Sequence, residues 1–134
     1  MQNFRNLRVW QRAHQLTPAV YRLSDTFPAR ERFGLTSQLR RSCTSIEANI
    51  AEGCGRRSDP ELARFLRIAM GSATETECHL LVSRDLRFAD ASQYSPVEQL
   101  VQEVERMLAG FLDKVESEAR ACEKRPHRVV PAVK

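Results

Sequence analysis

The side chains best suited to chemistry in this 134-residue sequence are arginines in its first half. A guanidinium group holds phosphate oxygens in pairs, and phosphate contacts supply most of the sequence-independent affinity of proteins for nucleic acids. We therefore predict a surface that binds RNA or DNA electrostatically, formed by Arg8, Arg12, Arg30, Arg32, Arg40, Arg41, Arg56 and Arg57. The alternative is that these arginines are solvated, or are paired with Glu31, Glu47, Glu52 or a neighbouring subunit.

Aromatic residues are poorly interleaved with these arginines. Trp10 and Tyr21 lie on or beside the apolar stripe of the first helical segment, so base stacking of the single-strand type is not expected. Binding should then depend on phosphate charge and weaken steeply as the salt concentration rises.

The charge of the chain is unevenly distributed, although its formal net value is only +4. Residues 1–57 hold ten Lys or Arg against four Asp or Glu, whereas residues 58–123 hold seven against thirteen. Residues 124–134 add four more Lys or Arg. This asymmetry can orient a polyanion on the basic side of the molecule. Alternatively, the two halves complement each other within one subunit or between subunits.

No pattern of residues predicts catalysis or metal binding. Glu75 and His79 share a helix face at a separation of four, but carboxylate-bridged di-metal bundles require Glu-x-x-His on two helices and two further glutamates. The segment 53–57 has the glycines of a phosphate loop, yet it lacks the Walker lysine and a preceding strand. We therefore expect a protein that is not an enzyme and has no cofactor, metal site or small-molecule substrate.

Two polar residues in the second helical segment have structural interpretations. We expect Asn49 to bond to the backbone or to a neighbouring helix, because a buried polar group needs a partner, and so to fix the register of the helices. Glu52 lies near the C-terminal end of that helix, where negative charge is unfavourable, which predicts an ion pair with Arg56.

The cysteines and the hydropathy pattern indicate a reduced, aqueous environment. Cys43, Cys54, Cys78 and Cys122 form no C-x-x-C pair, and we expect Cys43 and Cys78 to be small core residues. No apolar run approaches the roughly 20 residues that span a bilayer, and the N-terminus lacks the basic-then-apolar order of a secretory signal. We therefore expect a cytoplasmic protein without membrane contact.

Apolar residues recur every three or four positions along most of the chain, which is the period of one helical face. The expected fold is all-α, an antiparallel up-and-down four-helix bundle over residues 1–122. The four helices are predicted at about residues 5–24, 30–52, 59–87 and 96–122. Residues 123–134 form a basic, proline-containing tail that we expect to be flexible.

Proline and glycine indicate where the first two helices bend or end. Pro18 is expected to bend or split the first helix, because proline removes a backbone hydrogen bond. The second helix is expected to begin near Ala29 or near Leu35, and Gly53 to cap its C-terminus in the left-handed conformation.

Two capping boxes predict the starts of the last two helices. Ser58-x-x-Glu61 contains Pro60, and Ser95-Pro96-x-Glu98 places a proline at the first helical position. We therefore expect the third helix to begin near Asp59 and the fourth at residue 96.

The third helical segment is apolar on more than one face, which favours assembly of several copies of the chain. The apolar residues in its first half are Leu62, Phe65, Leu66, Ile68, Ala69 and Met70. We therefore expect a homo-oligomer. The same breadth supports the rival function, a protein-interaction or structural scaffold with no nucleic-acid role.

Several segments, taken together, resemble a known family. They are Phe4-x-x-Leu7-x-Val9-Trp10-x-x-Ala13, Val20-Tyr21-x-Leu23, Phe27-Pro28-x-x-Glu31-x-Phe33-Gly34-Leu35-x-x-Gln38-x-Arg40-Arg41, Ser45-Ile46-x-x-Asn49-Ile50-Ala51-Glu52-Gly53 and Phe65-Leu66-x-Ile68-Ala69-x-Gly71-Ser72-x-x-Glu75. In this order and at these distances, over about residues 4 to 115, they are similar to the four-helix-bundle proteins encoded in intervening sequences of bacterial 23S rRNA.

The resemblance implies a compact antiparallel bundle, assembly into a ring-like homopentamer and no known enzymatic activity. It also implies kinship with the accessory protein of diversity-generating retroelements, a pentameric barrel whose basic surface is thought to bind nucleic acid. This chain departs from the pattern at Pro18, in the absence of a glycine from residues 84–88, and in its tail. None of these departures threatens the fold, but the role of the tail stays open.

Overall fold

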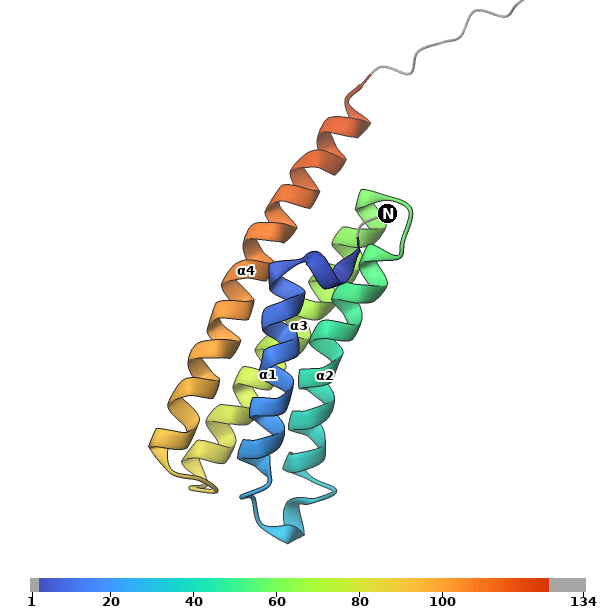
Figure 1. Cartoon of the computed structure of the whole chain (residues 1–134). Helices are drawn as coiled ribbons and strands as arrows, with labels where there is room; N and C mark the ends of the chain where they lie inside the picture. Colours follow the sequence, from blue (N-terminus) through green and yellow to red (C-terminus); the bar gives the residue numbers. More distant parts are fainter. Residues whose placement is uncertain (1–2, 126–134) are drawn as a thin grey trace, which may run out of the picture.

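The computed structural model describes residues 3–125, and within that range all regular structure is helical. The main helices are α1 (Arg8–Ser24), α2 (Leu35–Cys54), α3 (Asp59–Asp85) and α4 (Ala91–Glu123), and two short 3-10 helices are η1 (Phe4–Asn6) and η2 (Ala29–Glu31). Figure 1 shows α1 and α3 running in one direction and α2 and α4 in the other, with the end of α4 extending past its neighbours. The predicted all-α class with four helices is confirmed.

The core lies along the centre of the bundle, where each helix contributes one buried stripe. The largest aliphatic side chains that are completely buried are Leu16, Val20, Leu39, Ile46, Ile50, Leu66, Leu80, Val101, Val104 and Leu108. Each helix packs on two neighbours, in the order α1, α2, α3, α4 and back to α1. Truncation of one such side chain to alanine typically costs about 2–5 kcal/mol, so these residues contribute strongly to the stability of the fold.

Helix α1 is continuous through Pro18, so the expected split is not present. Pro18 and His14, four residues earlier, are both exposed. The carbonyl of His14 has no helical donor, because proline lacks an N–H, but its exposed position leaves it open to water.

Helix α2 begins at Leu35, the later of the two expected starts, and not at residue 30. Residues Ala29–Glu31 form the separate turn η2. The side chain of Glu31 accepts a hydrogen bond from the backbone N–H of Leu35 at 3.1 Å. This carboxylate therefore satisfies one of the unpaired N–H groups at the start of α2, where negative charge is also favourable.

Gly53 is not a helix cap, because α2 continues to Cys54 and no glycine within residues 3–125 has a positive φ. A Cβ atom added to Gly53 would lie 2.9 Å from Cβ of Phe65 and 3.0 Å from Cδ1 of Leu62. The absence of a side chain therefore allows α2 and α3 to approach closely, which was not the role that the sequence suggested.

Helix α3 begins as predicted, at Asp59, with the Ser58 hydroxyl accepting a hydrogen bond from the N–H of Glu61 at 3.3 Å. Its C-terminal end is unusual, because Arg87 has a φ of 59°, in the left-handed region that favours glycine. The N–H of Phe88 bonds to the carbonyl of Ser83 at 3.1 Å, and the N–H of Arg87 to that of Arg84 at 3.0 Å. These two bonds define a Schellman motif, closed here without the glycine that the family resemblance leads one to expect.

Helix α4 begins at Ala91, five residues before the expected start, so Pro96 lies inside the helix. The side-chain oxygen of Gln93 accepts a hydrogen bond from the N–H of Asp90 at 2.9 Å, which provides the N-terminal cap. Pro96 is exposed and early in the helix, so its missing N–H disturbs the packing little. The expected tail falls almost entirely outside the described residues, whereas α4 extends to Glu123.

Candidate nucleic-acid interface

The structure separates the eight predicted arginines along the length of the bundle. Arg30, Arg32, Arg40 and Arg41 lie at or near the α1–α2 connection, Arg56 and Arg57 lie in the α2–α3 turn, and Arg8 and Arg12 lie in the first half of α1. The α1–α2 connection and the α2–α3 turn are at opposite ends of the bundle (Figure 1). Because an α-helix rises about 1.5 Å per residue, Arg41 lies about 20 Å before the end of α2 at Cys54, after which the turn with Arg56 follows. No single patch therefore contains all eight.

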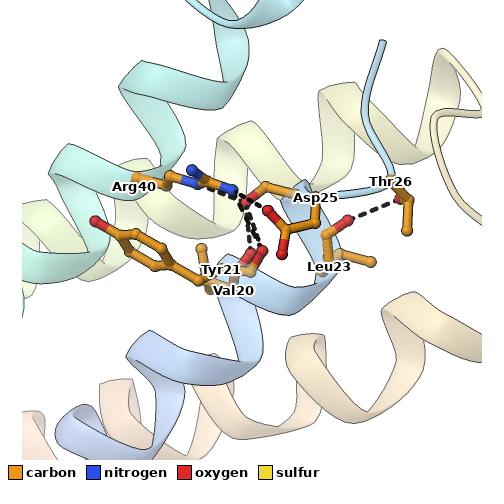
Figure 2. Close-up of polar contacts among 7 residues, drawn as sticks. Val20, Tyr21, Leu23, Asp25, Thr26 and Arg40 are labelled. Carbon is orange, nitrogen blue, oxygen red and sulfur yellow. Dashed lines mark hydrogen bonds and ion pairs between the residues drawn. The ribbon is translucent and has the colours of Figure 1, made fainter. Parts of the chain in front are cut away.

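Arg40 is fully engaged in holding α2 against the end of α1, as Figure 2 shows. Its Nε donates to the Ser24 hydroxyl at 2.8 Å, and its Nη2 donates to Asp25 Oδ1 at 2.9 Å and to the Tyr21 carbonyl at 3.3 Å. The guanidinium also lies 4.5 Å from the centre of the Tyr21 ring. A positive charge on the last carbonyls of a helix is favourable, so this arginine has a structural role.

Arg12 and Arg56 are also paired. Arg12 bonds to Glu103 on α4 at 2.9 Å and to Gln15 at 2.8 Å. Arg56 bonds to Glu52 at 3.0 Å, which confirms the predicted pair, and its guanidinium lies 4.9 Å from the centre of the Phe65 ring. The alternative of intramolecular pairing therefore holds for these two arginines and for Arg40.

The other five predicted arginines are exposed and form no ion pair within residues 3–125. They are Arg8, Arg30, Arg32, Arg41 and Arg57. Arg30 lies 6.0 Å from the centre of the Phe88 ring, and Arg32 lies 5.5 Å from that of Phe33. Their charges are therefore available to an external anion.

Two of these arginines line an open hollow of about 450 Å³ between α1 and the start of α2, which we call the α1–α2 groove. Its walls are three arginines, two aromatic residues and three residues with hydroxyl groups: Tyr21, Arg32, Phe33, Thr36, Ser37, Arg40, Arg41 and Thr44. No acidic side chain lines it. The groove therefore brings three of the candidate arginines together with two aromatic rings.

The exposure of the two aromatic rings corrects the sequence interpretation. Phe33 is 90% exposed and Tyr21 is 40% exposed, so both present ring surface to solvent beside arginines. The sequence places Tyr21 on or beside an apolar stripe, but its ring is partly exposed. Phe33 lies between Arg32 and Gly34 and outside any apolar periodicity, which is the signal that could have identified it.

The polar residues of α2 have structural roles. Asn49 Nδ2 donates to the Ser45 carbonyl at 2.8 Å and to the Ser45 hydroxyl at 2.9 Å. The Ser45 hydroxyl lies 2.9 Å from the Ser72 hydroxyl on α3. Asn49 is thus linked through Ser45 to the neighbouring helix, as predicted.

Residues 3–125 contain no cluster of three or more His, Cys, Asp or Glu placed to hold a metal ion. Glu75 and His79 form a pair at 3.3 Å on α3 without further ligands. No helix in the described part of the chain is long and apolar enough to cross a membrane.

The cysteines of the described region are all unpaired thiols. Cys43 is buried, as predicted, and burial raises its pKa to about 11, so this thiol is unreactive at neutral pH. Cys78 is exposed, so its prediction as a core residue is wrong.

One half-buried carboxyl pair, formed by Glu105 on α4 and Glu77 on α3, could not be predicted from the sequence. Burial, the negative charge of Glu77 and a hydrogen bond to Glu77 raise the pKa of Glu105 to about 6. At neutral pH, repulsion between the two negative charges lowers the stability of the folded protein.

These observations define a class: a four-helix bundle with surface arginines that have no acidic partner. The sequence matches the model of the 23S rRNA-intervening sequence proteins over residues 5–110, and the chain belongs to that family. A similar solved structure is that of a protein with unknown function from the S23 ribosomal protein family of Bacteroides thetaiotaomicron. The two share 25% sequence identity with a TM-score of 0.72, over 78% of this chain and 97% of that one. No curated protein matches the sequence.

Proposed function

We propose that this protein is a non-enzymatic, homo-oligomeric helical bundle of the cytoplasm that binds RNA or DNA through its basic surface. The observation that carries the proposal is the pair Arg32 and Arg41, which line one groove that has no acidic side chain in its walls. Neither forms an ion pair within residues 3–125. A phosphate backbone would supply the missing negative charge and release counterions as it binds.

The position of the paired arginines supports this choice of groove. Arg40 is paired with Asp25, so the uncompensated positive charge of the groove comes from the other two arginines that line it. Arg12 and Arg56 are compensated by Glu103 and Glu52. We therefore assign phosphate binding to Arg32 and Arg41, with Arg8, Arg30 and Arg57 as weaker, separate contacts.

The test is a double charge reversal, Arg32→Glu with Arg41→Glu, in the full-length protein. Arg40 is left unchanged because its loss would disturb α1. Fluorescence anisotropy with a labelled 20-nucleotide RNA should show at least a tenfold loss of affinity, and the slope of log K against log salt should fall by about 2. The matched control is Lys114→Glu with Arg120→Glu, which changes the net charge equally on an exposed part of α4. Equal losses in both double variants would contradict a specific site.

Self-association is supported by a stripe of exposed residues along the outer face of α3 and its C-cap, which is apolar at three positions. Ile68, Val82 and Leu86 are 42%, 42% and 55% exposed, and helical geometry places them on one side together with exposed Gly71 and Glu75. Light scattering should give about five times the 15.3 kDa mass of the chain, as the family resemblance implies. Val82→Glu should reduce that mass while the circular dichroism spectrum is unchanged.

A protein-interaction scaffold is the second candidate, and the same stripe favours it. If Val82→Glu leaves the mass unchanged and the wild-type protein binds no RNA, the stripe is available to a different protein. With these two results, a protein-interaction scaffold would describe the function of this protein better than nucleic-acid binding does.

A further inference from the structure

The α1–α2 groove contains a feature that electrostatic binding does not explain, a phenylalanine ring exposed to solvent. Phe33 is 90% exposed, although an aromatic ring is among the side chains that gain most from burial. Arg32 lies over this ring, at 5.5 Å from its centre, and Tyr21 presents a second half-exposed ring to the same hollow.

We propose that the α1–α2 groove binds a short single-stranded segment of nucleic acid, with one base stacked on Phe33 and its flanking phosphates on Arg32 and Arg41. This inference rests on the proposed function and names its substrate class. Sites that bind single strands combine a basic surface with aromatic rings on which bases stack. In a duplex the bases are already stacked on one another, so an aromatic ring at the surface has no base face to contact.

The polar lining of the groove suits an unpaired strand. Ser37 is exposed, and its hydroxyl forms no hydrogen bond with other described residues. It lies one helical turn before Arg41 on α2, on the side of the helix that faces the hollow. A hydroxyl in that position can bond to a base edge or to a sugar, and these groups are accessible in a single strand.

The pairing of Arg40 also favours stacking on Phe33 and not on Tyr21. The Arg40 guanidinium lies 4.5 Å from the centre of the Tyr21 ring and so covers part of it. Tyr21 is accordingly less exposed than Phe33, at 40% against 90%. The first base to bind should therefore contact Phe33, with Tyr21 forming another part of the groove wall.

The experiment compares three labelled 12-nucleotide probes with the full-length protein: single-stranded oligothymidine, a duplex of the same length, and an abasic strand that has phosphates but no bases. Stacking contributes about 1–3 kcal/mol per base, so Phe33→Leu should weaken oligothymidine binding about 5- to 160-fold. The same variant should leave the affinities for the duplex and the abasic strand unchanged.

Phe33→Trp should bind oligothymidine as well as the wild type or better, because it keeps an aromatic face. Leu81→Ala is the control for loss of an exposed apolar side chain elsewhere.

The outcomes separate this inference from the proposed function. If no probe binds the wild-type protein, nucleic-acid binding itself fails. If all three probes bind equally and Phe33→Leu changes none of them, binding is purely electrostatic and the stacking inference fails alone. If Phe33→Leu instead lowers the mass of the assembly measured by light scattering, Phe33 is a contact between copies of the chain and the inference is overturned.

Discussion

Arg40 on α2 donates a hydrogen bond to the hydroxyl of Ser24 at the end of α1, across a separation of 16 residues in the sequence. The Ser24 hydroxyl in turn donates to the Val20 carbonyl at 2.8 Å, so the arginine is joined to the last turn of α1 (Figure 2). This arrangement removes Arg40 from the group of arginines available for phosphate.

Arg40→Ala should therefore destabilise the fold, by about 1–2 kcal/mol, because it removes a cation and several hydrogen bonds from the C-terminus of α1. Urea denaturation followed by circular dichroism measures the effect. Arg41→Ala, at the exposed neighbouring position, should change the free energy of unfolding by less than about 0.5 kcal/mol. If the two variants are equally stable, Arg40 has no structural role and should be restored to the binding surface.

The carboxyl pair of Glu105 and Glu77 predicts a dependence of stability on pH. Because the pKa of folded Glu105 is about 6, above its ordinary value of 4.5, the folded protein holds the proton more tightly than the unfolded chain does. The stabilising contribution of that proton is complete below pH 4.5 and is lost as the pH rises through 6. Glu105→Gln should therefore have little effect at pH 4 and should stabilise the protein by about 1 kcal/mol at pH 7.

Urea denaturation of wild type and Glu105→Gln at pH 4, 5, 6 and 7 measures this difference. Glu118→Gln on the exposed part of α4 is the control for loss of a negative charge. A constant difference between Glu105→Gln and wild type over this range would contradict the interaction with Glu77.

Close packing at Gly53 predicts opposite effects for the same substitution at two helical glycines. Gly53→Ala should destabilise the protein by about 1–3 kcal/mol, because its new Cβ would collide with Phe65 Cβ. Gly110→Ala on α4 should stabilise it by up to about 1 kcal/mol, since a Cβ there meets nothing within 4 Å and alanine favours a helix. Thermal unfolding measures both, and equal shifts in Tm would show that α2 and α3 can separate enough to accept the methyl group.

The sequence was sufficient to predict features that depend on residues close together in the chain. The apolar period along α2, with Leu39, Ile46 and Ile50, follows directly from helix geometry, and all three are completely buried. The start of α3 at Asp59 was predictable because its capping residues are adjacent in sequence.

What the sequence could not supply depends on how the helices are placed against each other. The bond between Arg40 and Ser24 and the contact between Glu105 and Glu77 require the register of two helices, which no single segment encodes. The role of Gly53 could not be predicted from the sequence for the same reason, since it is defined by Phe65 and Leu62 on α3. The candidate site was therefore predicted only as a set of arginines, and its division into paired and unpaired members came from the structure.

The left-handed residue at the end of α3 gives a test of local strain. Arg87 has a φ of 59°, a conformation that costs a residue with a Cβ about 1–2 kcal/mol and costs glycine almost nothing. Arg87→Gly should therefore stabilise the protein, by about 0.5–1 kcal/mol after the greater freedom of glycine in the unfolded chain is subtracted. Arg87→Ala removes the same charge and retains the Cβ, so it should give no such gain.

The Schellman hydrogen bond from the Phe88 amide to the Ser83 carbonyl is present in either variant. Hydrogen exchange at the Phe88 amide should therefore show that this bond opens more slowly in Arg87→Gly alone. Equal stabilisation by glycine and alanine would attribute the effect to charge and not to backbone conformation.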